Sequence, residues 1–94
     1  DLRTVRPMDE EAVLKTARDC GKVLVVTEDR FWGGVGPTIA SLITRGEGIF
    51  TLEAPVKLVT ALDSRVAYGL DGDAICLPSV DKITEALEEL HSKY

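Results

Sequence analysis

A glycine-rich turn is the part of this sequence best suited to hold a small ligand. Gly33, Gly34 and Gly36 follow an apolar segment and precede a helical pattern, where a dinucleotide-binding loop would lie. The GxGxxG spacing fails, because Ile39 stands where a third small residue would let the helix pack closely. Two interpretations follow. We favour a tight strand-to-helix connection that uses positive φ angles over an anion site at the helix N-terminus.

Asp71 and Asp73 flank Gly72 and resemble a metal-binding loop only superficially. A calcium-binding loop of the EF-hand type needs oxygen ligands at alternate positions and a closing glutamate at the twelfth. Here the apolar segment 74–77 follows instead. We therefore expect a solvated turn and no metal site.

Acid–base catalysis has few candidate residues in this chain. His91 is the only histidine, and it lies near the end of the last expected helix, where a solvated side chain is expected. No serine or cysteine has a plausible partner base in the sequence. Cys20 and Cys76 lie far apart without a CxxC spacing, so a disulfide stays possible, although we favour two buried free thiols in a reducing compartment. The sequence thus predicts no catalytic residue.

Phe31 and Trp32 stand directly before the glycine turn. Two adjacent aromatic side chains are costly to leave in water, so we expect them to be buried at a domain–domain or subunit contact. The candidate interface is therefore Phe31, Trp32, Gly33 and Gly34.

Length and charge restrict the class of protein. Ninety-four residues are enough for one domain, 45% of them are apolar, and no uninterrupted apolar run could span a membrane. A net charge of −5 argues against binding to nucleic acid or anionic lipid and favours a basic protein partner. The chain starts at Asp1 without an initiator methionine, from which we expect a fragment of a longer chain.

Apolar residues follow strand-like and helix-like patterns in turn along the chain, which predicts alternating strands and helices. This order favours a three-layer α/β fold with a mostly parallel sheet. An irregular segment, 62–75, contains Gly69 and Gly72 as breakers. The expected elements are a short strand Leu2–Arg6, a helix from Asp9 to Gly21, a strand Lys22–Thr27 covered on both faces, a helix that begins near Val35 and ends at Gly46, a strand Val56–Ala61, and a last helix capped by Ser79 with an apolar face of Val80, Ile83, Leu87 and Leu90.

Five sequence pieces, in this order, resemble the C-terminal domain of the transketolase superfamily. They span nearly the whole chain: DLRTVRPMD (1–9), VLVVTE (23–28), GGVG (33–36), EAPV (53–56) and LPSVDKI (77–83). The resemblance is greatest to the β subunit of the thiamine-dependent decarboxylase component of 2-oxo acid dehydrogenase complexes, of the pyruvate or branched-chain type. Transketolase and deoxyxylulose-phosphate synthase carry a matching domain and are the alternative within the superfamily. A free-standing anion- or nucleotide-binding domain is the alternative outside it.

The resemblance implies a mixed sheet whose first strand is antiparallel, in an enzyme with α and β subunits, commonly a heterotetramer. It implies that thiamine diphosphate and magnesium bind outside this domain. It also implies two non-catalytic roles: holding β subunits together, and docking on a small basic subunit-binding domain of the acyltransferase component. Asp63 and the C-terminal Tyr94 carboxylate would lie in the docking regions, and the compartment would be the bacterial cytoplasm or the mitochondrial matrix. The chain departs from the family pattern at Asp29-Arg30-Phe31-Trp32 and over residues 64–76.

Overall fold

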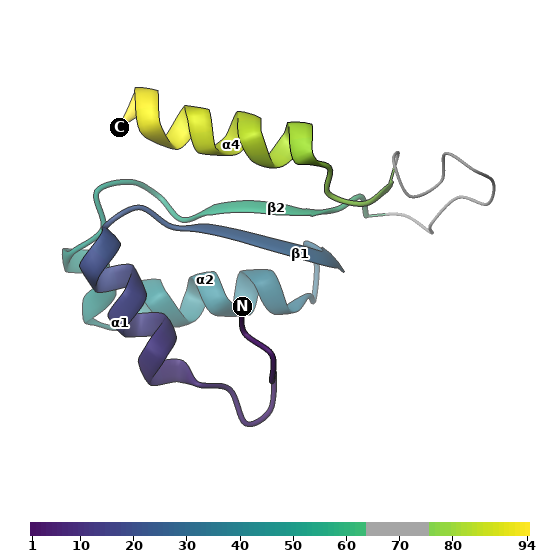
Figure 1. Ribbon diagram of the computed structural model, residues 1–94. Helices are drawn as coiled ribbons and strands as arrows, with labels where there is room; N and C mark the ends of the chain where they lie inside the picture. Colours follow the sequence, from purple (N-terminus) through teal and green to yellow (C-terminus); the bar gives the residue numbers. More distant parts are fainter. Residues whose placement is uncertain (64–75) are drawn as a thin grey trace.

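The computed structural model describes residues 1–63 and 76–94 as a parallel sheet with helices on both faces (Figure 1). Two helices cover one face and the C-terminal helix lies over the other. This confirms the three-layer α/β class. The elements in chain order are α1 (Glu10–Cys20), β1 (Leu24–Arg30), α2 (Val35–Arg45), the short 3-10 helix η1 (Glu47–Phe50), β2 (Lys57–Ala61) and α4 (Val80–Lys93).

The helix ends follow the capping residues that the sequence indicated. The Asp9 carboxylate accepts a hydrogen bond of 3.1 Å from the Ala12 N–H at the start of α1. The Ser79 hydroxyl accepts one of 3.2 Å from the Lys82 N–H at the start of α4. Such caps satisfy backbone donors that have no partner within the helix. Both helix starts are therefore encoded locally.

α2 packs close to the sheet because a glycine faces it. A Cβ added at Gly36 would lie 3.0 Å from Thr27 Cγ2 and 3.1 Å from Leu58 Cδ2. Further along the same helix, Ile43 is only 1% exposed and is the largest fully buried side chain among the described residues. Thr27 and Leu58 thus mark the sheet face that α2 covers.

α4 covers the opposite sheet face unevenly. Lys57 of β2 forms an ion pair of 2.5 Å with Glu89 of α4, so Lys57 and Val59 lie on the α4 face. Val26 is the partner of Val59 in the parallel register and shares that face. Val59 is 8% exposed whereas Val26 is 44% exposed. The expectation of a first apolar strand covered on both faces is therefore wrong for β1, because α4 packs over β2.

Two expectations about strands are corrected. β1 continues through polar residues to Arg30, beyond the expected end at Thr27. Leu2–Arg6 forms no strand: the Thr4 N–H donates to the Leu2 carbonyl (2.7 Å), and Arg3 has a φ of 62°. This local turn uses the backbone groups that a ladder would need. The antiparallel first strand is accordingly missing from the described part of the sheet, where both strands run parallel.

The cysteines differ in burial. Cys76 is buried as expected, but Cys20, at the end of α1, is exposed and carries a free thiol. The expectation of a buried thiol at Cys20 is wrong because α1 leaves part of its apolar stripe uncovered. None of the described helices is long and apolar enough to cross a membrane.

Candidate interaction surface

The candidate interface residues lie at the carboxyl end of the parallel strands. Arg30 and Ala61 are register partners at the ends of β1 and β2. Phe31 follows the first of these residues and Leu62 follows the second. The turn after β1 and the chain after β2 therefore leave the sheet at the same edge, where open parallel sheets commonly place binding residues.

Phe31 and Trp32 form an aromatic pair on this edge. Their ring centroids are 5.6 Å apart and the ring planes meet at 81°, an edge-to-face arrangement. Phe31 is 43% exposed and Trp32 is 76% exposed. Pairs with this geometry are favourable in themselves, so the two rings hold each other in place while their outer surfaces face water. The pair is an apolar surface available to a partner.

Hydrogen bonds at the end of β1 and in the first turn of α2 flank the turn that carries the aromatic pair. The Asp29 N–H donates to Thr27 Oγ1 at 3.2 Å, and the Arg30 N–H donates to Asp29 Oδ1 at 2.8 Å. After the turn, the Thr38 hydroxyl of α2 donates to the Gly34 carbonyl at 3.3 Å. The aromatic pair therefore stands on a defined backbone.

Gly33 and Gly34 have steric roles in this turn. Gly33 has a φ of 76°, in the region that favours glycine. A Cβ added at Gly34 would lie 2.1 Å from the Arg30 carbonyl oxygen, closer than any side chain could tolerate. Both observations support the favoured interpretation of the glycines as a tight strand-to-helix connection.

Asp63 is exposed and lies at the same edge as the aromatic pair. It follows Leu62, whose N–H donates to the Cys76 carbonyl at 2.8 Å. Leu62 itself is 47% exposed. The structure thus brings a carboxylate and a partly exposed leucine to the edge that carries Phe31 and Trp32.

Tyr94 lies at the other end of the molecule. α4 runs back along the sheet, so the C-terminus lies near the amino end of the strands (Figure 1). The helix has 14 residues, which corresponds to a length of about 21 Å at 1.5 Å per residue. The Lys93 ammonium lies 5.5 Å from the centre of the Tyr94 ring. The two predicted docking residues, Asp63 and Tyr94, are therefore not brought together.

A second exposed aromatic surface, in η1, was not expected from the sequence. Ile49 is 54% exposed and Phe50 is 86% exposed. The tight turn depends on Gly48, where an added Cβ would lie 2.6 Å from the Ile43 carbonyl oxygen. The only sequence signal for this exposed surface is an adjacent Ile and Phe beside two glycines. The same residues are equally typical of a buried loop.

The apolar face expected for α4 is only partly covered. Leu90 is 5% exposed and Ile83 is half-buried, whereas Val80 and Leu87 are 78% and 51% exposed. Val80 and Leu87 are seven residues apart and lie on one flank of the helix. The opposite flank carries Glu89, which binds β2.

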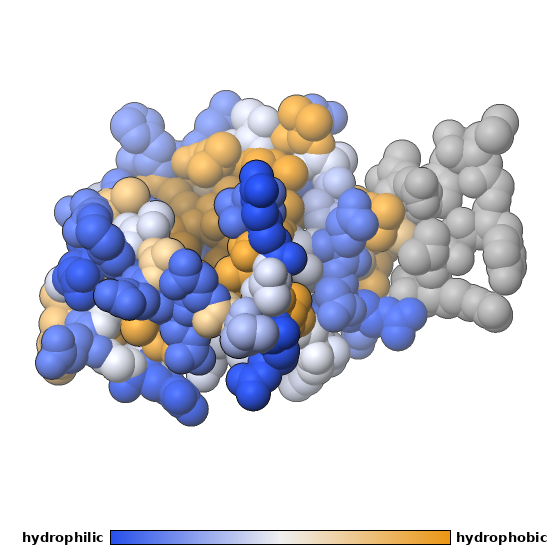
Figure 2. Space-filling view, turned by 60° about the horizontal axis from the view of Figure 1, so that its bottom comes forward, coloured by the Kyte–Doolittle hydropathy of each residue, from blue (hydrophilic) through white to orange (hydrophobic). Residues whose placement is uncertain are grey.

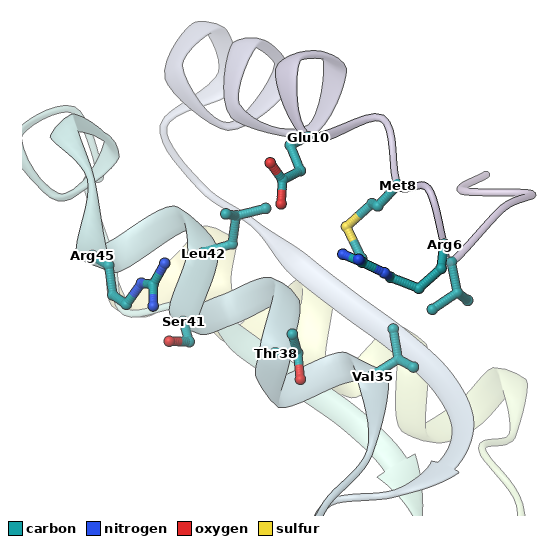
Figure 3. Close-up of a pocket in the computed structure, with 9 residues that line it drawn as sticks. Arg6, Met8, Glu10, Val35, Thr38, Ser41, Leu42 and Arg45 are labelled. Atoms are coloured by element: carbon teal, nitrogen blue, oxygen red, sulfur yellow. The ribbon is translucent and has the colours of Figure 1, made fainter.

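The close-up in Figure 3 shows a hollow between the N-terminal segment and α2. Its volume is about 290 Å³, and Met8, Val35 and Leu42 are among the residues that line it. Arg6 approaches from the N-terminal segment and Arg45 from the end of α2. Within the described part of the chain, neither arginine takes part in an ion pair. This hollow could not be predicted from the sequence, because its two walls are distant along the chain.

Two carboxylates have pKa values displaced by neighbouring lysines. The Lys57 ammonium hydrogen-bonds to Glu89 and lowers the pKa of that carboxyl. Lys15 lowers the pKa of Asp19 in the same way, through an i, i+4 pair on α1. Both pairs are exposed enough for water to screen them, so neither indicates a reactive site.

The expected solvated His91 is confirmed as an exposed residue near the end of α4. Among residues 1–63 and 76–94, no three His, Cys, Asp or Glu side chains gather as metal ligands. The Asp71–Asp73 turn lies outside the described residues, as do Gly69 and Gly72. The described surface carries exposed apolar groups and scattered charges.

Comparison with known proteins identifies the family of this chain. The model of the transketolase C-terminal domain family matches residues 1–83. The β subunit of the pyruvate dehydrogenase E1 component from Rickettsia conorii is 32% identical over 90 residues, which are 96% of this chain and 27% of that subunit. The 2-oxoisovalerate dehydrogenase β subunit of Bacillus subtilis is 36% identical over 91 residues, 96% of this chain and 28% of the relative. The mitochondrial pyruvate dehydrogenase E1 β subunit of Saccharomyces cerevisiae is 29% identical over 92 residues, 98% of this chain and 25% of the relative.

These relatives confirm the resemblance found in the sequence, although the chain spans only about a quarter of their length. The matched residues include the turn of Phe31–Gly34, Asp63 and the start of α4. By family match and fold together, this chain belongs to the transketolase C-terminal domain family.

Proposed function

We propose that this domain is the non-catalytic assembly and docking part of the decarboxylase component of a 2-oxo acid dehydrogenase. The observation that carries the proposal is the exposed Phe31–Trp32 pair on a fixed glycine turn. Rigid, clustered aromatic side chains are the residues that dominate protein–protein interfaces. The relatives are β subunits of such enzymes, which supports a partner β subunit and an α subunit as the proteins that cover this surface.

The parent enzyme would carry out thiamine-diphosphate-dependent oxidative decarboxylation of a 2-oxo acid, with acyl transfer to lipoyl groups. The described residues do not offer a cluster of ligands for magnesium. From the family resemblance, we assign thiamine diphosphate and its magnesium to other parts of the parent enzyme. Relatives from bacteria and from yeast mitochondria support the cytoplasm or the mitochondrial matrix as the compartment.

Charge supports a basic docking partner. The chain carries a net charge of −5, and Asp63 is exposed beside the apolar edge. The subunit-binding domain of the acyltransferase component is such a partner. A carboxylate next to aromatic side chains can lose its water on binding, and a desolvated ion pair then determines the dissociation rate more than the association rate.

Subunit association tests the assembly role. The variant Trp32→Ala in the parent β subunit should weaken association by about 2 kcal/mol, a typical loss for a buried interface tryptophan. Analytical ultracentrifugation of the purified subunits measures this constant. A matched control is Phe50→Ala, which removes an exposed aromatic ring at the other end of the domain. Unchanged association in the Trp32→Ala variant would contradict the assembly role of this edge.

Fluorescence reports the same contact without a substitution. Trp32 is the only tryptophan of this chain and is 76% exposed. Its emission should be red-shifted in the 94-residue domain and blue-shifted in the assembled enzyme, because burial removes water from the indole. In the parent enzyme, the Trp32→Phe difference spectrum isolates this signal. Identical emission in both states would show that no subunit covers Trp32.

Surface plasmon resonance tests docking on the assembled enzyme. With the acyltransferase subunit-binding domain as ligand, Asp63→Asn should weaken binding by about 2 kcal/mol if the pair is desolvated, and much less if it lies at the rim. A salt series separates the two cases. If Asp63→Asn leaves the affinity unchanged at every salt concentration, docking lies elsewhere and the domain serves subunit assembly alone.

A further inference from the structure

The hollow between the N-terminal segment and α2 carries two arginines that have no side-chain partner among the described residues. Arg6 comes from one wall and Arg45 from the other (Figure 3). Acidic residues outnumber basic ones in this chain, 16 to 11. Even so, neither arginine forms an ion pair with any residue in 1–63 or 76–94. Two unpaired guanidinium groups beside one hollow favour an anionic ligand.

The hollow is elongated along α2. Its lining residues on this helix include Val35, Thr38, Leu42 and Arg45, which are three or four residues apart and therefore form one stripe. From Val35 to Arg45 the helix rises about 15 Å. Figure 3 shows Arg6 and Val35 at one end of the hollow and Arg45 at the other. The two positive groups thus stand at opposite ends.

Much of the remaining lining is apolar. Met8, Val35 and Leu42 are half-buried residues of its walls. The Thr38 hydroxyl already donates to the Gly34 carbonyl at 3.3 Å, so it offers a ligand no donor. Figure 2 brings forward the side of the molecule that carries the N-terminal segment, α1 and α2, and shows hydrophobic residues exposed between hydrophilic ones. These walls suit a hydrocarbon chain better than a row of hydroxyl groups.

We propose that this hollow binds a small α,ω-dicarboxylate, with one carboxylate on Arg6, the other on Arg45, and the hydrocarbon chain against Met8 and Leu42. A planar guanidinium can hold a carboxylate through two parallel N–H···O bonds. Both arginines are exposed, so each can turn toward a ligand shorter than the stripe. The volume of about 290 Å³ lies at the lower end of the range for small-molecule sites, which suits a short chain and not a nucleotide.

Glu10 also lines the hollow and affects which anions fit. It forms no ion pair with either arginine in the described structure. Because like charges repel, Glu10 should weaken the binding of any anion. Inorganic phosphate concentrates its charge in one group and has no carbon chain for the apolar walls. A dicarboxylate instead carries its charges at the two ends, where the arginines are.

Calorimetric titration of the parent β subunit with adipate tests this site. Hexanoate is the matched control, because it has the same number of carbon atoms and one carboxylate fewer. We expect a dissociation constant of about 1 mM or tighter for adipate, and at least about fivefold weaker binding of hexanoate. Equal affinities for the two compounds would overturn the proposal, since only one end of the hollow would then be used. Absence of adipate binding up to about 10 mM would overturn it as well.

Substitutions locate the bound adipate. Arg6→Gln and Arg45→Gln should each weaken adipate binding at least about fivefold. Arg18→Gln is the control: it removes the same charge from an exposed position of α1 that does not line the hollow, and should change the affinity less than about twofold. Glu10→Gln should strengthen binding about two- to threefold, because it removes a repulsive charge. If Arg6→Gln and Arg45→Gln behave like Arg18→Gln, adipate binds elsewhere in the subunit and the proposal is wrong.

This inference goes beyond the proposed function, and the two can fail separately. Trp32→Ala should leave adipate binding unchanged, and Arg45→Gln should leave subunit association unchanged. Loss of association in Trp32→Ala with full adipate binding would support both proposals. Adipate binding that disappears with association would place the ligand at a subunit contact and overturn the hollow as its site.

Discussion

The two ends of the sheet both carry exposed aromatic residues, but they present them differently. At the carboxyl end of the strands, Phe31 and Trp32 pack edge to face directly after a hydrogen-bonded end of β1. At the amino end, Phe50 of η1 is 86% exposed and forms no ring contact with another described aromatic residue, and Tyr94 ends α4. At both ends, the turn with the exposed aromatic residue needs a glycine, because an added Cβ would meet a backbone carbonyl oxygen. The glycine is Gly34 at one end and Gly48 at the other.

The difference separates the proposed interaction site at the carboxyl end from incidental exposure at the amino end. Single exposed apolar residues are normal on protein surfaces and carry no functional signal. The carboxyl end instead combines a mutual aromatic contact, hydrogen-bonded flanks of the turn, and a carboxylate, Asp63, at the same sheet edge. Ordering these groups before binding reduces the entropy lost when a partner docks. The carboxyl end is thus the better-prepared surface, and four predictions test that comparison.

The largest effect is expected from breaking the turn itself. An added Cβ at Gly34 would lie 2.1 Å from the Arg30 carbonyl oxygen, so Gly34→Ala should lower the free energy of unfolding by more than about 2 kcal/mol. Gly33→Ala is the control: it meets no atom within 4 Å and should cost about 1 kcal/mol for its positive φ alone. Urea unfolding of both variants measures the difference. Equal losses of unfolding free energy in the two variants would mean that the backbone moves to accept the added Cβ. The turn would then be less rigid than we infer.

The next effect separates binding from stability. Trp32→Ala should change the free energy of unfolding by no more than about 0.5 kcal/mol, because an exposed side chain contributes little to the fold. The same variant should weaken subunit association roughly 30-fold, the equivalent of about 2 kcal/mol. Phe50→Ala should alter neither quantity appreciably. A greater loss of association for Phe50→Ala than for Trp32→Ala would reverse the ranking of the two ends.

A third prediction concerns whether the two ends act together in docking. Asp63 and Tyr94 lie at opposite ends of the domain, separated by roughly the length of α4. Asp63→Asn and an extension of the chain after Tyr94 should therefore have additive effects on the affinity for the subunit-binding domain, within about 0.5 kcal/mol. Surface plasmon resonance on the two single variants and the double variant measures the coupling. A coupling well above that limit would mean that one partner contacts both ends at once.

Much of the fold could be predicted because its signals are local. Asp9 and Ser79 cap the helices that follow them, and glycines mark where helices end. The end of β1 could not be predicted, because Glu28, Asp29 and Arg30 are polar and resemble a loop. The strand continues to Arg30 because Arg30 pairs with Ala61 of β2, after an irregularity in the register between Val26 and Arg30. The predicted strand Leu2–Arg6 failed for the converse reason: a strand needs a neighbour, and no described strand pairs with this segment.

The candidate site divides in the same way. The sequence indicated Phe31 and Trp32 because adjacent aromatic residues beside glycines are unusual, and the structure places them on the surface. Whether a subunit buries them stays a prediction. The exposure of Val26 and Leu87 could not be predicted, because burial depends on which elements lie above a side chain. The Arg6–Arg45 hollow was equally inaccessible, since its walls come from segments that meet only in the folded chain.

The smallest predicted effect concerns how α4 is held on β2, midway between the two ends. Hydrogen bonding by Lys57 lowers the pKa of Glu89 in the folded chain. A carboxyl whose pKa falls on folding stabilises the folded state above its ordinary, unfolded pKa, and this contribution is lost as the pH falls through the folded pKa. At pH 7, the Glu89→Gln variant should therefore have a slightly lower free energy of unfolding than the unmodified domain. In acid, the two free energies should become equal. Urea unfolding measures this difference from pH 7 down to the pH range in which carboxyl groups titrate. The control is Glu88→Gln, on the exposed side of the same helix. Because the pair is partly exposed, added salt should reduce the effect. A difference between Glu89→Gln and the parent that persists unchanged in acid would show that Glu89 contributes through packing and not through its charge.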